Sequence, residues 1–325
     1  MQSITATNPH ADSANAPPAV RAAFAPARNL ADAQEFTRQL AQSHYENFSV
    51  VSLLLPRHLR QDFCNIYAFC RIADDLGDSI PDRELAMSSL ARFADAARAC
   101  YAGEPVSAVF IALGDTIRRH EIPIQPFLDL IDAFQQDQHV TRYDTFAQLL
   151  DYCRRSADPV GRLVLYICGY RDAERQRLSD RTCSALQLAN FWQDVRRDLL
   201  ELDRIYIPAE SLRRFGVSEE QLRAGRFDHN VRALMQFEVD RTESMFDEGE
   251  ALLPMLEPTV RAHVGLFASG GRAILRAIRN QDYDTLTRRP TLSAIQKGRL
   301  IALGFATQLT RVFARPARAA SGGSR

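Results

Sequence analysis

The chain has 325 residues, of which 46% are hydrophobic and 25% are charged, and this composition excludes wholesale disorder and a fibrous protein. Forty Lys and Arg balance forty Asp and Glu, so the formal net charge is zero. Zero net charge argues against a protein that binds nucleic acid by neutralising phosphates, so no nucleic-acid partner is expected.

Helical periodicity dominates the chain between two tails. Residues 1–28 are rich in Ala, Pro, Ser and Asn without a sustained period, and we expect a disordered tail there. Apolar residues recurring at i, i+3, i+4 and i+7 predict helices over residues 30–42, 84–103, 107–120 and 126–138. Strand-like alternation is scarce, and no Gly/Ser linker divides the middle. The sequence therefore predicts an all-α fold with one domain over residues 29–315, followed by a flexible basic tail over 316–325.

Capping residues and prolines indicate where helices begin and end. Ser218 and Gln221 have the spacing of a capping box at a helix start. Asp158 precedes Pro159, and the residue before a proline is disfavoured in the α region, which predicts a break between two helices. The break either exposes carbonyl oxygens to a cavity or is only a kink needed for packing.

The first chemically informative stretch is CRIADDLGDS, residues 70–79. On a helix, Asp74 and Asp78 lie one turn apart on the same face, and Tyr67 and Arg71 continue that face. Two like charges one turn apart destabilise a helix unless a positive group lies between them. Arg71 can supply that charge, and so can Mg²⁺, which prefers oxygen ligands and joins one or two carboxylates to substrate phosphate. For a single acidic cluster, a solvated helix face is the more common explanation.

A second stretch, QLANFWQDVRRDLLE, repeats the pattern. Four of its polar residues fall on one narrow helical face, namely Gln187, Asn190, Asp194 and Asp198. A surface helix would pair these acids with Arg196 and Arg197, whereas Phe191 and Trp192 indicate a helix that packs inside the protein. Because buried carboxylates need a charge partner, the repetition favours a site over a solvated face.

Two helices that each present an Asp-x-x-x-Asp pair toward a common cavity can hold Mg²⁺ against a diphosphate. Metals and Arg side chains stabilise the negative charge that develops as diphosphate leaves an allylic or cyclopropylcarbinyl carbon. The carbocation left behind requires an apolar cavity with aromatic faces, which attract cations. The pattern therefore predicts ionisation of a prenyl diphosphate.

Four stretches resemble the squalene and phytoene synthase family: IYAFCRIADDLGD, DYCRRSADPVG, LQLANFWQDVRRD and RIYIP. The resemblance runs from about His44 to the RNQDYDTLTRR segment near residue 289. It implies an isoprenoid-synthase-type helical bundle around a central cavity, with Mg²⁺-bound diphosphate at the cavity mouth. The implied metal ligands are Asp74, Asp78, Asn190, Asp194 and Asp198. The implied substrate-binding residues are Arg71, Gln187, Asn190, Asn47, Phe48 and Arg204.

The same four acids are implied to be catalytic, together with two tyrosines of the active-site region, Tyr67 and Tyr206, and with His44. His44 is a candidate base or water-positioning residue, and an ordinary packed histidine is the alternative. Tyr206 either closes the cavity mouth or packs a loop against a helix.

One departure from the family pattern concerns residues 44–48, HYENF. Many members that join two allylic diphosphates have a His-Ser-Lys-Ser-Phe type stretch there, and its Lys helps hold a diphosphate. Glu46 replaces that Lys and would repel a diphosphate oxygen at this position. With LLLPRHLR, NFWQDV and CRRSADPVG, this run is most similar to the bacterial hydroxysqualene synthases. That branch implies ionisation of presqualene diphosphate, rearrangement and water capture, to give hydroxysqualene in squalene and hopanoid biosynthesis.

Two other functions stay open at this stage. One is head-to-head condensation of prenyl diphosphates to presqualene diphosphate, squalene or phytoene. The other is a catalytically inactive helical scaffold, which could lose its acidic ligands at no cost, whereas all four are present. No G-x-G-x-x-G run follows a strand-like segment, so no NADPH is expected, although nicotinamide also binds other folds.

Targeting and compartment follow from the remaining features. The six cysteines show no metal-type spacing, and the start of the chain lacks a basic segment before an apolar one, so we expect reduced thiols and a cytoplasmic protein. The longest apolar stretches fall short of the about 20 residues that span a bilayer. The stretch VVSLLLP or residues 299–314 can still provide a peripheral contact at the inner membrane face. Other enzymes of the squalene pathway are expected as functional partners.

Overall fold

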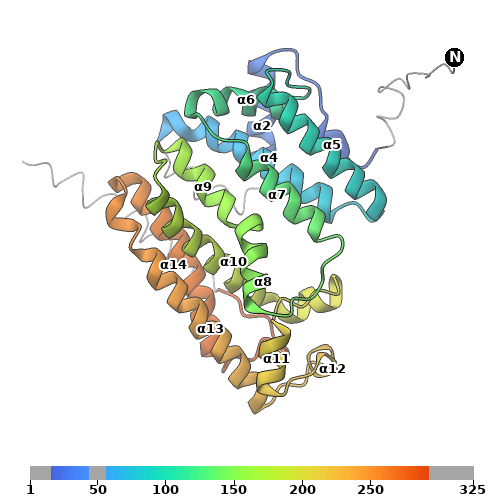
Figure 1. Cartoon of the computed structure of the whole chain (residues 1–325), viewed down its shortest axis with the longest axis vertical. Helices are drawn as coiled ribbons and strands as arrows, with labels where there is room; N and C mark the ends of the chain where they lie inside the picture. Colours follow the sequence, from blue (N-terminus) through green and yellow to red (C-terminus); the bar gives the residue numbers. More distant parts are fainter. Residues whose placement is uncertain (1–15, 44–55, 293–325) are drawn as a thin grey trace, which may run out of the picture.

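The chain folds almost entirely into helices, as Figure 1 shows for the computed structural model, which describes residues 16–43 and 56–292. The first helices are α1 (Pro18–Ala23), α2 (Leu30–Ser43), the short 3₁₀ helix η1 (Arg57–Leu59), α4 (Arg60–Asp78), α5 (Arg83–Tyr101), α6 (Ala108–His120) and α7 (Gln125–Gln136). The others are α8 (Phe146–Ser156), α9 (Asp158–Ile167), α10 (Ala173–Glu201), α11 (Ala209–Phe215), α12 (Glu219–Arg223), α13 (His229–Glu250), the 3₁₀ helix η2 (Leu253–Met255) and α14 (Pro258–Asn280). Within the described ranges there is no β-strand, which confirms the predicted all-α class.

Local sequence signals set several helix boundaries. All four helices predicted from apolar periodicity are present as α2, α5, α6 and α7. Ser218 accepts the Gln221 N–H at 3.2 Å at the start of α12, as its spacing predicted. The predicted break at Pro159 separates α8 from α9, with Ala157 between them at φ −123° and ψ −49°.

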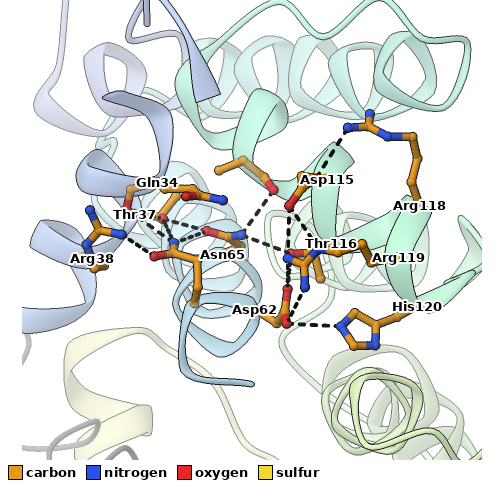
Figure 2. A network of polar contacts seen from close by, with 12 residues as sticks. Gln34, Thr37, Arg38, Asp62, Asn65, Asp115, Thr116, Arg118, Arg119 and His120 are labelled. Atoms are coloured by element: carbon orange, nitrogen blue, oxygen red, sulfur yellow. Dashed lines mark hydrogen bonds and ion pairs between the residues drawn. The ribbon is translucent and has the colours of Figure 1, made fainter. Parts of the chain in front are cut away.

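The N-terminal helices enclose a first apolar core. Phe69 on α4 contacts the rings of Phe93 on α5, Phe110 on α6 and Phe127 on α7, with centroid separations of 4.9–6.1 Å. This side of the molecule also carries a buried polar network between α2, α4 and α6, in which Asp62 and Asn65 of α4 are the central residues (Figure 2).

A second apolar core surrounds the single tryptophan, Trp192 of α10. Trp192 is completely buried and donates its indole N–H to Thr242 of α13 at 2.7 Å. α8, α13 and α14 pack around this part of α10. α9 packs against both α4 and α10, so it joins the two halves of the molecule (Figure 1).

Part of the segment expected to be a disordered tail is ordered. Residues 18–23 form α1, which packs against α4. Ala19 and Ala23 are buried in the first apolar core, so the small side chains that suggested disorder instead allow close helix packing. The expected tail at 316–325 and the candidate membrane segment 299–314 lie outside the described residues, as does VVSLLLP apart from Pro56.

Candidate active site

An apolar cavity of about 430 Å³ lies between α4, α9, α10 and α14. The rings of Phe63, Tyr67 and Phe267 form part of its wall, which matches the expected aromatic lining. Ser156 and Ala157, at the break between α8 and α9, also line it. The predicted central cavity is therefore present, and its wall suits a hydrocarbon chain.

Both predicted polar faces begin at this cavity. We call Tyr67, Arg71, Asp74 and Asp78 the α4 stripe, and Gln187, Asn190, Asp194 and Asp198 the α10 stripe. Tyr67 and Gln187, the first member of each, line the same cavity. Asp74 and Asp194 each follow seven residues later, which is about 10 Å along a helix axis. Each stripe thus runs from the apolar cavity to a pair of carboxylates.

The α4 stripe is only partly neutralised within its own helix. Arg71 lies 3.2 Å from the Asp74 carboxylate and 2.5 Å from that of Asp75, so the arginine is shared between two acids. Burial and, after it, the negative charge of Asp78 raise the pKa of Asp74 to about 6, although Arg71 opposes the shift. Arg71 therefore leaves uncompensated negative charge on this face.

The α10 stripe has a different environment. Asp194 is 4% exposed and forms a bidentate ion pair with Arg289, in which Nη2 lies 3.0 Å from Oδ2. Burial and, after it, the neighbouring charge of Asp194 raise the pKa of Asp198 to about 7. Asn190 is exposed and Gln187 is half-buried. This face also retains a carboxylate whose charge is poorly compensated.

The arginines next to the α10 acids have other partners. Arg196 donates to the Leu286 carbonyl at 2.9 Å, and Arg197 pairs with Glu201 at 3.0 Å. The partner of Asp194 comes instead from residue 289, beyond α14. Helical spacing could not reveal this pair, because the two residues are 95 positions apart.

Arg204 connects the acid ends of the two stripes. It follows α10 in the RIYIP segment, its side chain is only 11% exposed, and its Nη2 lies 3.7 Å from the Asp78 carboxylate of α4. Its positive charge also acts on Asp198 of α10. The stripes therefore share the cavity at one end and Arg204 at the other, which supports the predicted convergence on one site.

Tyr206 lies inside the protein next to Arg204. It is 8% exposed, and its ring stacks on Phe191 of α10 with a centroid separation of 3.6 Å and an interplanar angle of 6°. Tyr143 and Tyr152 complete this aromatic group at about 6 Å. Tyr206 therefore packs its loop against α10, and its predicted role in the active site stays a prediction.

Sequence reasoning missed Asp137, the residue that directly follows α7. This residue is 8% exposed and accepts the Tyr152 hydroxyl at 2.8 Å. Burial raises its pKa to about 7, and the charges of Asp78 and Asp74 contribute, so it lies close to the acid end of the α4 stripe. No motif spacing marks Asp137, because it reaches the site through the packing of α7 on α4.

The donor set suits a hard divalent cation. Within residues 16–43 and 56–292, no group of three His, Cys, Asp or Glu side chains is already gathered to hold a metal. Each stripe instead supplies a pair of carboxylates, and Mg²⁺ commonly takes one or two carboxylates plus water and substrate phosphate. The assignment of Asp74, Asp78, Asn190, Asp194 and Asp198 as metal ligands stays a prediction.

Three predicted site residues, His44, Asn47 and Phe48, lie outside the described residues. The same holds for Glu46, on which the distinction between one and two diphosphates rests. None of the helices in the described part of the chain is both long and apolar enough to cross a bilayer.

Comparison with known proteins agrees with this geometry. A family model described as squalene/phytoene synthase matches residues 41–296. The chain is 49% identical to the squalene synthase HpnC of Alicyclobacillus acidocaldarius in its crystal structure, with a TM-score of 0.75 over 78% of this chain and 96% of that one. A dehydrosqualene synthase in complex with ligand has the same fold, with a TM-score of 0.76, 22% identity, and coverage of 86% of this chain and 98% of that one. A phytoene synthase of Thermus thermophilus is 35% identical over 268 residues, which are 82% of this chain and 90% of the relative.

Proposed function

Since the chain belongs to the squalene/phytoene synthase family, we propose that it converts presqualene diphosphate to hydroxysqualene, with Mg²⁺ as its metal and without NADPH. The observation that carries the proposal is the 49% identity to a bacterial squalene synthase over nearly the whole of that protein. The acidic residue at position 46 supports the choice of a substrate with one diphosphate.

The acidic ends of the two stripes supply the diphosphate site in this proposal. The residues that hold Mg²⁺ are Asp74, Asp78, Asn190, Asp194 and Asp198. Bound there, Mg²⁺ supplies positive charge that stabilises the departing diphosphate. Arg71 and Arg204 lie beside the same carboxylates and donate N–H groups to the diphosphate oxygens.

The reaction needs no electron donor. The carbon–oxygen bond to the diphosphate breaks with both electrons on oxygen, which leaves a cyclopropylcarbinyl cation. After the cation rearranges, a water oxygen forms the new carbon–oxygen bond and releases one proton to solvent. The cavity walls hold the hydrocarbon and exclude other nucleophiles from it.

Three thiols in the cavity wall are compatible with a carbocation. Cys70, Cys168 and Cys183 line the cavity, and burial raises the pKa of each to about 12. They therefore stay protonated at neutral pH, and a thiol is a much weaker nucleophile than a thiolate. The wall therefore presents no thiolate to the cation at neutral pH.

Product analysis tests the proposal directly. Purified protein with Mg²⁺ and presqualene diphosphate should release hydroxysqualene and diphosphate without NADPH. The matched reactions contain farnesyl diphosphate or geranylgeranyl diphosphate in place of presqualene diphosphate. A product formed only from those two substrates would refute the proposal.

Head-to-head condensation is the second candidate, and the phytoene synthase among the relatives favours it. Such a reaction binds two diphosphates, and both stripes would then have to serve two leaving groups. The geranylgeranyl diphosphate reaction distinguishes the two, because phytoene forms from that substrate alone.

The substrate and product are apolar, and we propose a peripheral contact with the inner membrane face. Val160 and Phe267 line the cavity and are 40% and 43% exposed, so apolar surface continues from the cavity to the outside. Vesicles containing anionic lipid should sediment the protein at low salt. Failure of the protein to sediment at low salt would contradict this contact.

A further inference from the structure

The face of α10 that carries the acids continues along the cavity wall. Ser179, Cys183 and Gln187 line the cavity and follow one another at intervals of four residues, so they share one helical face. The α10 stripe begins at Gln187 and ends at Asp198 on that same face. α9 and α14 both pack against α10 (Figure 1). α10 therefore extends from the carboxylates to the far end of the cavity.

An apolar cluster closes the cavity at the end away from the acids. We call this cluster the floor, and its five buried residues come from α9, α10, η2 with its flanks, and α14, namely Leu165, Leu178, Leu252, Leu256 and Val260. Leu165 and Val260 also line the cavity, so the floor is continuous with the cavity wall. Leu178 directly precedes the cavity-lining residue of α10 that is farthest from the acids.

Hydrogen bonds hold the floor in place. The backbone N–H of Glu257, just before α14, donates to the hydroxyl of Tyr170 at 2.8 Å. Arg175, in the first turn of α10, donates to the Met255 carbonyl of η2 at 3.0 Å. These bonds tie the segment from η2 to α14 to the segment that joins α9 to α10. A hydrocarbon chain cannot push the floor aside without breaking them.

The length of α10 between the acids and the floor limits the length of a bound chain. Ser179 lies fifteen residues before Asp194, which is about 22 Å along the helix axis. With Mg–oxygen bonds of about 2 Å, a metal ion and a diphosphate take up about 6 Å of this length, so about 16 Å remain. An isoprene unit adds four main-chain carbons, or about 5 Å when extended, because a carbon–carbon bond is about 1.5 Å long. Three units therefore fit above the floor, and a fourth does not.

We propose that the floor limits a prenyl arm lying along α10 to three isoprene units, and that Leu165 and Val260 are the residues that determine this limit. The inference rests on the proposed function, because it places the diphosphate at the acidic ends of the two stripes. Both side chains meet the last carbons of the arm and take no part in the departure of diphosphate.

Binding of unreactive analogues tests the length limit without depending on turnover. In farnesyl and geranylgeranyl thiodiphosphate, sulfur replaces the ester oxygen, so the diphosphate stays attached during titration calorimetry with Mg²⁺. The wild type should bind the farnesyl analogue at least about tenfold more tightly, because a fourth isoprene unit would overpack the floor. Equal affinities for the two analogues would overturn the proposal.

Leu165→Ala deepens the cavity by removing part of the floor. The space gained should raise the affinity for the geranylgeranyl analogue by about tenfold relative to the affinity for the farnesyl analogue. Leu113→Ala on α6 is the matched control, because Leu113 is as buried as Leu165 but belongs to the first apolar core and does not line the cavity. An equal change of the affinity ratio in the control would overturn the proposal.

Val260→Phe tests the limit in the opposite direction and replaces Leu165→Ala if that variant does not fold. The larger side chain raises the floor, so the affinity for the farnesyl analogue should fall by about tenfold. Geranyl thiodiphosphate, which is one unit shorter, should bind within about threefold of its wild-type affinity. Equal losses for both analogues would overturn the proposal. If hydroxysqualene is not the product but the analogues bind as expected, the proposed reaction fails and the length limit stands.

Discussion

Each end of α4 carries an aspartate that is buried or half-buried. The charge of one is compensated by several hydrogen-bond donors, and the charge of the other is not. Asp62, in the first turn, is completely buried and accepts two N–H groups of Arg119, the Thr116 hydroxyl at 2.7 Å and a close contact from His120 Nε2 at 3.0 Å (Figure 2). Asp74, toward the other end, shares one arginine with Asp75 and faces a second acid, Asp78.

The helix itself adds to the difference. A negative charge is favoured at a helix N-terminus and disfavoured at a C-terminus, because the backbone dipoles align along the axis. Asp62 lies at the favoured end, whereas Asp74 and Asp78 lie in the last turns of α4, and Asp194 and Asp198 lie toward the C-terminal end of α10. A satisfied acid contributes to stability, and an under-compensated acid remains available to a cation.

The largest expected effect comes from removing an acid of either stripe. Asp74→Ala and Asp194→Ala should each lower turnover by on the order of 10³-fold, because the leaving diphosphate loses its electrostatic stabilisation. Turnover is measured with presqualene diphosphate, and circular dichroism checks that the fold is kept. Unaltered turnover in both variants would refute the metal assignment and with it the contrast with Asp62.

Removing the satisfied acid should affect stability instead. Asp62→Ala should lower the free energy of unfolding by about 3 kcal/mol, because Arg119, Thr116 and His120 lose their common acceptor. Urea unfolding measures the loss, and the protein that remains folded should keep its turnover. Asp95→Ala, on an exposed face of α5 that pairs with Arg98, is the control and should show no measurable change.

The raised pKa values predict a pH dependence of metal binding. Asp74 and Asp198 have pKa values of about 6 and 7, so both are largely protonated at pH 5.5 and ionised at pH 8. Mg²⁺ binds the ionised form, and its affinity should therefore rise by on the order of tenfold or more between pH 5.5 and pH 8. Calorimetric titrations at the two pH values test this, and equal affinities would show that these acids are not the ligands.

The smallest effect concerns the stability of the metal-free protein. Because the folded pKa of Asp198 is raised above its ordinary value, folding is penalised once the carboxylate ionises, and the penalty grows as pH rises from about 4 to about 7. Asp198→Asn should therefore melt a few degrees higher than the wild type at pH 8 in EDTA, and at the same temperature at pH 4. A lower melting temperature at pH 8 would mean that Asp198 has a compensating partner in the fold.

The sequence predicted the two stripes because they depend on local geometry. Helical spacing fixes which residues share a face, so Tyr67 and Asp74, like Gln187 and Asp194, could be grouped before any tertiary structure was available. The family resemblance placed these faces at one site, and the cavity and Arg204 bring them together. The all-α class followed in the same way from apolar periodicity.

Helical spacing in the sequence could not predict the hydrogen-bond partners that come from distant parts of the chain. The pairs Asp194 with Arg289 and Arg204 with Asp137 join residues 95 and 67 positions apart, and each depends on how a loop returns to α10 or α7. Residues 18–23 show that composition has the same limit as spacing. Their Ala and Pro residues suggest a disordered tail, but in the structure they form a helix that packs against α4.

The sequence by itself therefore determined the long helices that carry the two stripes, their polar faces and the residue types available for diphosphate chemistry. Only the tertiary structure decided which charges are neutralised and which are left uncompensated. The physical reason is that a face is set by the 3.6-residue turn of one helix, whereas neutralisation requires two segments to meet at hydrogen-bond distance.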